Sequence, residues 1–229
     1  MFMIHPAHAG CEVYTNYAQV ISNDYECYGI DNYNLHNSNK LTSLDILATY
    51  YLSAIKEKFS LQLDSEVTLF GWSMGGLISL KMASILEQGG YTNIRVYLLD
   101  TIVNDKVLNE RYSHLNYAGL KEKLYTDMSA KYPLEYVNKV IANYETERKL
   151  ITEVMSDKLR YTRVILFKAM QPDPRFELDI NVYIKSLTYN NVDMLMENPS
   201  QIQLIQVEDA SHGNILDINQ HCIKIISYK

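Results

Sequence analysis

The chain has 229 residues, of which 47% are hydrophobic and 21% charged, and its formal net charge is −6. This length and apolar content suit one globular domain, and an acidic chain without a basic face is not expected to bind nucleic acid. The three cysteines are far apart and predict neither a disulfide framework nor a metal site, and the absence of a long apolar run predicts no membrane partner and a cytoplasmic location.

The first half of the chain alternates strand-like and helix-like segments. Short apolar runs bounded by turn residues predict strands at 1–4, 25–30, 66–70 and 94–100. Helical spacing of apolar residues predicts helices between them, at about 14–21, 44–59 and 74–88. Strands separated by helices cannot pair as simple hairpins, so the pattern predicts an α/β fold with a parallel sheet covered on both faces.

The character of the sequence changes between 104 and 161, where charged residues and tyrosines dominate and the pattern is helical. Strands are expected again at 162–169 and 201–208, followed by a closing helix from about Asn214. We therefore expect a single domain, 1–229, with a core of 1–103 and 162–229 and a helical lid of about 104–161. The lid contains tyrosines that are candidates to line a pocket: Tyr112, Tyr117, Tyr125, Tyr132, Tyr136 and Tyr144.

The segment "LFGWSMGG" places Ser73 between Gly71 and Gly75, where a strand is expected to give way to a helix. A G-x-S-x-G sequence at such a junction is typical of a nucleophile elbow, a tight turn that needs small neighbours and pushes the serine hydroxyl out above the sheet. The start of the following helix supplies free backbone N–H groups. The sequence thus predicts Ser73 as nucleophile and the N–H of Met74 as an oxyanion donor.

A serine nucleophile needs a general base and an acid that orients the base. His212 follows the last expected strand, which is where the chain order serine, acid, histidine puts the base. Asp100 directly closes an apolar strand at the same sheet edge and is the favoured acid, with Asp173 after the next strand as the alternative. The second oxyanion donor is expected from the loop "HPAHAG", with the N–H of Ala7 as candidate and Gly10 giving the chain freedom to turn.

Four segments in this order, "MFMIHPAHAG", "LFGWSMGG", "VYLLDT" and "SHGNIL", resemble the thioesterase domains that terminate nonribosomal peptide synthetases and polyketide assembly lines. The resemblance covers essentially the whole chain. It implies an α/β-hydrolase fold with a mostly parallel central sheet, flanking helices and a helical lid insertion, and it gives Ser73, Asp100 and His212 the roles of a catalytic triad. The residues before His212, Ala210 and Ser211, depart slightly from the family pattern. The base itself is retained, but the resemblance does not show which groups hold it in place.

The resemblance also implies an activity. A carrier protein would present an acyl or peptidyl chain as a phosphopantetheine thioester, and the enzyme would release the chain by hydrolysis or macrocyclisation through acyl-Ser73, with no bound cofactor and no metal. Two other hypotheses remain open, an editing thioesterase or small-molecule esterase, and a non-catalytic binding module. Editing enzymes of the family usually have histidine before the serine and the acid one strand later. Trp72 and Asp100 therefore favour the releasing type, while Asp173 keeps the editing type open.

Overall fold

The computed structural model describes residues 1–216. Its centre is a six-stranded sheet in the order β2-β1-β3-β4-β5-β6, and each neighbouring pair is parallel. The parallel α/β fold predicted from the sequence is confirmed. The strands are β1 (Phe2–Ile4), β2 (Tyr28–Ile30), β3 (Val67–Trp72), β4 (Ile94–Leu99), β5 (Arg163–Ala169) and β6 (Ile202–Val207).

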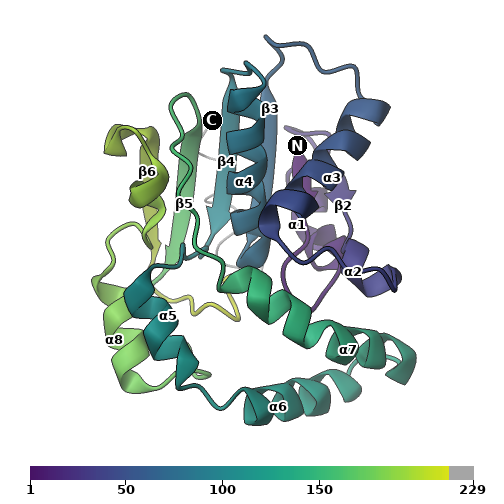
Figure 1. The fold of residues 1–229 in the computed structure, drawn as a ribbon, viewed down its shortest axis with the longest axis vertical. Helices are drawn as coiled ribbons and strands as arrows, with labels where there is room; N and C mark the ends of the chain where they lie inside the picture. The colour runs from purple at the N-terminus through teal and green to yellow at the C-terminus, as the bar shows by residue number, and fades with distance from the viewer. Residues whose placement is uncertain (217–229) are drawn as a thin grey trace.

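Helices connect the strands and cover the sheet (Figure 1). The α-helices are α1 (Thr15–Val20), α2 (Tyr33–His36), α3 (Leu44–Lys58), α4 (Met74–Gln88), α5 (Lys106–Ser113), α6 (Tyr117–Ser129), α7 (Leu134–Ile151) and α8 (Leu178–Ser186). Three short 3₁₀ helices are η1 (Cys11–Tyr14), η2 (Val192–Leu195) and η3 (Pro199–Gln201). Within residues 1–216, no helix is both long and apolar enough to cross a lipid bilayer.

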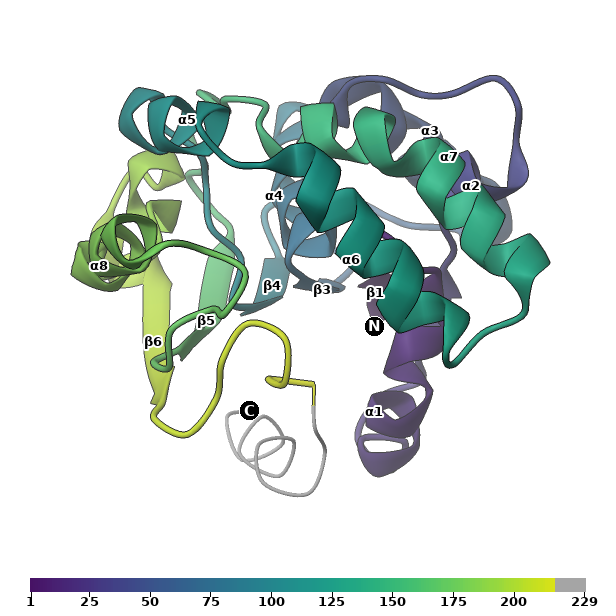
Figure 2. The ribbon, with the colours of Figure 1, turned by 90° about the horizontal axis from the view of Figure 1, so that it is seen from below.

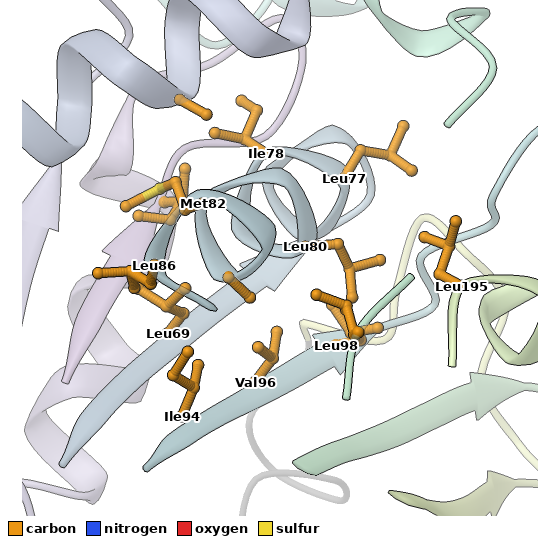
Figure 3. Packing of buried hydrophobic residues seen from close by; sticks show 14 of the residues in the cluster. Leu69, Leu77, Ile78, Leu80, Met82, Leu86, Ile94, Val96, Leu98 and Leu195 are labelled. Atoms are coloured by element: carbon orange, nitrogen blue, oxygen red, sulfur yellow. The ribbon is translucent and has the colours of Figure 1, made fainter. Parts of the chain in front are cut away.

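The two faces of the sheet form separate hydrophobic clusters, because alternate residues of a strand point to opposite sides. On one face, Leu69, Val96 and Leu98 pack with α3 and α4, as the close view in Figure 3 shows for α4. On the other face, Phe70 and Tyr97 pack with residues of η1 and α1. Figure 2 shows α3 and α4 on one side of the strands and α1 on the other. Burial on both faces explains why the strands read as continuous apolar runs.

Helices α5, α6 and α7 lie between β4 and β5 in the chain and account for the helical insertion predicted at 104–161. Figure 1 shows them along the lower end of the sheet, where β3 and β4 end. Helix α6 packs against α7, and α7 contacts α2 and α4. The insertion therefore lies over the carboxyl edge of the sheet, the edge at which parallel α/β folds place their sites.

The polar stretch between β5 and β6 differs from the expectation, because we assigned it no element and it contains α8. This helix buries little of its own surface: Ile180 is buried, while Leu178 and Val182 are exposed. Ile180 packs against Leu108 and Tyr112 of α5, so the helix depends on tertiary contacts that its weak apolar spacing does not reveal. The closing helix expected from about Asn214 lies mostly outside the described residues, and 214–216 form a turn.

Candidate active site

Ser73 is the single residue between the end of β3 and the start of α4. Its backbone has φ 55° and ψ −122°, an unfavourable conformation for a residue with a side chain. A Cβ atom on Gly71 would overlap the backbone of Gly75, and one on Gly75 would overlap the carbonyl oxygen of Ile4 in β1. The two glycines thus let the turn close tightly against β1, as the elbow motif predicts.

Asp100 follows β4, and His212 lies in the turn beyond β6. The Nδ1 atom of His212 lies 2.8 Å from Oδ2 of Asp100. The other oxygen, Oδ1, accepts the N–H of Ala169 at 3.1 Å and the side-chain amide of Asn190 at 3.2 Å. A carboxylate oxygen accepts from Nδ1–H, so this contact favours the imidazole tautomer whose Nε2 can accept a proton.

The support of His212 comes from Trp72. The indole Nε1–H donates to the backbone carbonyl of His212 at 3.1 Å, and the two rings lie 5.5 Å apart at an interplanar angle of 36°. Ser211 adds a bond from its N–H to Oδ1 of Asn214 at 2.7 Å, which closes the turn that carries the histidine. The contacts of Trp72 and Asn190 could not be predicted from the sequence, because each joins segments far apart in the chain.

Asp173, the alternative acid, is occupied by another partner. Arg175 donates to both of its carboxylate oxygens, at 2.5 to 3.1 Å, and the backbone N–H of Arg175 also donates to it at 2.9 Å. Burial raises the pKa of Asp173, but the hydrogen bonds and charge of Arg175 bring it below its ordinary value. Of the two aspartates, Asp100 is therefore the one in contact with the His212 ring.

The predicted oxyanion donors lie at the same cavity as these side chains. A cavity of about 400 Å³ is lined by Ala7, Ser73, Met74, Asp100 and His212 among others. Met74 is the first residue of α4, so its N–H has no acceptor within the helix. Ala7, Ser73, Met74, Asp100 and His212, the residues predicted for the site, thus all line this one cavity, as does the alternative acid Asp173.

The first loop, residues 5–10 after β1, turns in a way that differs from the expectation in one respect. Gly10 has an ordinary φ of −90°, and the left-handed residue is His8, with φ 64°. A Cβ at Gly10 would overlap the carboxylate oxygens of Asp31 and Glu12, so these side-chain ends would have to shift. The loop is therefore turned at His8 and packed closely at Gly10.

The remaining cavity wall comes from the insertion and from the segment after β5. Asn104, Tyr112 and Ile151 contribute from the insertion, and Phe176 and Leu178 from the start of α8 and the turn before it. Of the six tyrosines proposed to line a pocket, the lining includes Tyr112. Tyr136 instead donates from its hydroxyl to Glu12 at 2.6 Å, and Tyr144 stacks on His8 with ring centres 5.0 Å apart. The cavity wall is mixed: apolar side chains such as Leu77 and Phe176 alternate with polar and charged ones such as Gln171, Arg175 and Lys185.

No group of three or more His, Cys, Asp or Glu side chains within residues 1–216 is placed to hold a metal ion.

Comparison with known families decides the classification. The profile of the family described as "Thioesterase domain" matches residues 1–200. The chain belongs to the thioesterase domain family. It is 25% identical over 238 residues to N-(5-amino-5-carboxypentanoyl)-L-cysteinyl-D-valine synthase of Penicillium rubens, an alignment that covers 98% of this chain and 6% of the synthase. The chain thus spans a small fraction of the length of this curated relative.

Solved structures of thioesterases share the fold. The NocB thioesterase domain from the nocardicin cluster, in a covalent complex with a fluorophosphonate nocardicin G analogue, superposes with a TM-score of 0.72 at 18% identity. That match covers 99% of this thioesterase domain and 90% of the solved NocB thioesterase domain. The RedJ thioesterase from the prodiginine pathway of Streptomyces coelicolor gives a TM-score of 0.66 at 12% identity, with 99% and 87% coverage. These neighbours confirm the α/β-hydrolase fold, and the family profile over residues 1–200 confirms the thioesterase resemblance stated from the sequence.

Proposed function

We propose that this thioesterase domain releases an acyl or peptidyl chain from the phosphopantetheine thioester of a carrier protein through an acyl-Ser73 intermediate. The observation that carries the proposal is the 2.8 Å contact between His212 and Asp100 at the cavity that also exposes Ser73. The family and the peptide synthetase relative support the substrate class. We assign the carrier protein as partner for the same reason, and the cytoplasmic location remains a prediction.

In the first step, Nε2 of His212 takes the proton of the Ser73 hydroxyl as the serine oxygen attacks the thioester carbonyl. The N–H groups of Ala7 and Met74 donate to the resulting oxyanion. The tetrahedral intermediate collapses, the carbon–sulfur bond breaks, and the proton on His212 passes to the leaving thiol. Asp100 keeps the imidazole in the required tautomer and stabilises its positive charge during the step.

In the second step, His212 takes a proton from water or from a nucleophile within the bound chain, which then attacks the Ser73 ester. The serine oxygen leaves and recovers its proton from His212. Water yields a linear acid, and an internal nucleophile yields a ring. The two products differ in mass by one water, so mass spectrometry of the released product distinguishes hydrolysis from macrocyclisation.

The test uses a carrier protein loaded with a peptidyl-phosphopantetheine, compared with a short acyl thioester and a short ester at equal concentration. We expect the highest kcat/KM on the carrier-bound chain and no turnover above background in Ser73→Ala. Faster turnover of the short thioester or ester would favour an editing thioesterase or an esterase. Absence of any turnover and of labelling by a fluorophosphonate would favour a binding module.

A further inference from the structure

Glu147 of α7 is a buried carboxylate that none of the steps above uses. Its side chain has no solvent exposure. Backbone and side-chain amide donors surround it. The N–H of His8 donates to Oε2 at 2.7 Å, and the Nδ2 amide groups of Asn32 and Asn143 donate to Oε1 at 2.6 and 2.8 Å. Nδ1 of His8 lies 2.8 Å from Oε2. A side chain of the insertion thus holds the backbone of the first loop.

The preceding peptide of this loop is held by His5, which is fully buried. Nδ1 of His5 lies 2.8 Å from the carbonyl oxygen of Pro6, and Nε2 lies 2.7 Å from the hydroxyl of Tyr51. A carbonyl only accepts, so Nδ1 carries the proton and Nε2 accepts from Tyr51. In a trans peptide the N–H points opposite to the C=O, so fixing the Pro6 carbonyl also fixes the direction of the Ala7 N–H.

Ala7 therefore lies between two peptide planes that are each fixed by a hydrogen bond to a side chain. Rotation about its own φ and ψ is restricted because His5 fixes the plane before it and Glu147 fixes the plane after it. The left-handed φ of 64° at His8 is unfavourable, and the bond from the His8 N–H to Glu147 offsets that cost. Without Glu147 the loop would relax first at the plane next to Ala7.

We propose that Glu147 is a positioning residue that keeps the Ala7 N–H directed at the oxyanion and so links helix α7 to acyl transfer. The inference rests on the proposed function, since it assumes that the Ala7 N–H stabilises an oxyanion. Glu147 touches neither substrate nor Ser73 and acts through the loop. A change in the position of α7 would therefore change the rate of acylation.

The charge of Glu147 suits this role. Burial raises the pKa of Glu147, but its contact with His8 and the hydrogen bond from Asn32 bring it below the ordinary value and so favour the carboxylate form. Hydrogen bonds to an ionised acceptor are stronger than neutral ones. The N–H of His8 and the side-chain amides of Asn32 and Asn143 all donate to this carboxylate. In Glu147→Gln, one carboxylate oxygen becomes an NH₂ group, which is itself a donor. At least one of the three donors would then lose its acceptor.

The test compares Glu147→Gln with Glu153→Gln as matched control. Glu153, beyond the end of α7, also accepts a backbone N–H at 2.9 Å, but the donor is Leu44 at the start of α3 and not a residue of the first loop. Each variant is assayed with a peptidyl N-acetylcysteamine thioester for kcat and KM, and with a peptidyl trifluoromethyl ketone, whose adduct with serine carries an oxyanion. All assays run at a temperature where thermal unfolding shows the protein fully folded.

We expect kcat of Glu147→Gln to fall by about 10- to 100-fold with KM within about threefold, because a misdirected donor weakens the transition state more than the ground state. The inhibition constant of the ketone should rise by the same factor as kcat falls. Glu153→Gln should change kcat and the inhibition constant by less than about threefold, since its hydrogen bond to Leu44 does not hold the loop that carries Ala7. If Glu147 had a merely structural role, Glu147→Gln would lower the unfolding free energy and leave kcat and the inhibition constant of the ketone unchanged.

An unchanged kcat in Glu147→Gln, or an equal loss in Glu153→Gln, would overturn the inference. If Glu147→Gln fails to fold, Glu147→Asp serves as the test, because it keeps the charge but withdraws the carboxylate from His8. A wild-type kcat in Glu147→Asp would also overturn the inference. A wild-type protein that never acylates at Ser73 would overturn the proposed function and this inference with it. An active wild type with an unaffected variant would remove the inference alone.

Discussion

The imidazole of His212 and the carboxylate of Asp100 meet at 2.8 Å although 112 residues separate them in the chain. Two other groups, the N–H of Ala169 and the amide of Asn190, hold the far oxygen of the carboxylate. This carboxylate is thus oriented toward the histidine from β4, β5 and the segment after α8. Its contact with the histidine favours Asp100 over Asp173 as the acid, and replacing each aspartate tests that preference.

Replacing Asp100 by Asn should lower kcat by about 10⁴-fold, because an amide at this position favours the wrong tautomer of His212. Asp173→Asn is the matched control, since its carboxylate is bound by Arg175 rather than by the histidine. We expect less than a tenfold loss for that variant. Steady-state turnover of one thioester substrate by both variants checks this, and a larger loss in Asp173→Asn would reverse the assignment.

Trp72→Phe should lower kcat by about fivefold. The change removes the Nε1–H that donates to the carbonyl of His212 but keeps an aromatic ring beside the imidazole. A lost neutral hydrogen bond is worth about 1 kcal/mol, which corresponds to roughly that factor if the histidine turn loosens. The measurement is kcat with the unfolding free energy as control; a stability loss without a change in kcat would mean that Trp72 only packs.

Gly75→Ala should cost about 3 kcal/mol of unfolding free energy, because its Cβ would overlap backbone oxygen of Ile4 and neither β1 nor the elbow can move freely. Gly213→Ala is the control: its Cβ would meet nothing within 4 Å. We expect it to stay within about 0.5 kcal/mol of wild type. Urea unfolding of both variants checks the pair, and equal costs would contradict the close approach of β1 to the elbow.

The ion pair of Asp173 and Arg175 predicts a pH dependence of stability. The folded pKa of Asp173 lies below its ordinary value of 3.8, so the contribution of the carboxylate is complete above that value and is lost as pH falls through the folded pKa. The gap in unfolding free energy between wild type and Asp173→Asn should stay constant from pH 7 to about 5 and narrow below about 4. Urea titrations across this range measure the difference in unfolding free energy. A difference that stays constant below pH 4 would show that protonation of Asp173 does not affect stability.

The sequence predicted much of the fold and of the candidate site because local patterns carry both. Apolar runs predicted the strands, and the elbow motif and the strand ends pointed to Ser73, Asp100 and His212. The position of Glu147 could not be predicted in this way. It lies in a helix of alternating charges that reads as solvent-exposed, and its burial arises only when α7 packs over the first loop.

Contacts between distant segments were missed for the same reason. Asn190, which holds Asp100, and Trp72, which holds the turn of His212, have no local pattern that marks a role. Helix α8 was missed because it buries Ile180 against α5 and exposes much of the rest. Residues that form motifs could be predicted, and residues that orient them through tertiary contacts could not.

The central claim is that Ser73 becomes acylated. The most direct measurement is intact-mass spectrometry of the protein after rapid mixing with a peptidyl thioester, followed by peptide mapping of the adduct. We predict an added acyl mass on the peptide that contains Ser73 in the wild type, and none in Ser73→Ala, which keeps the wild-type circular dichroism spectrum. An adduct at another residue, or full turnover by Ser73→Ala, would contradict the account.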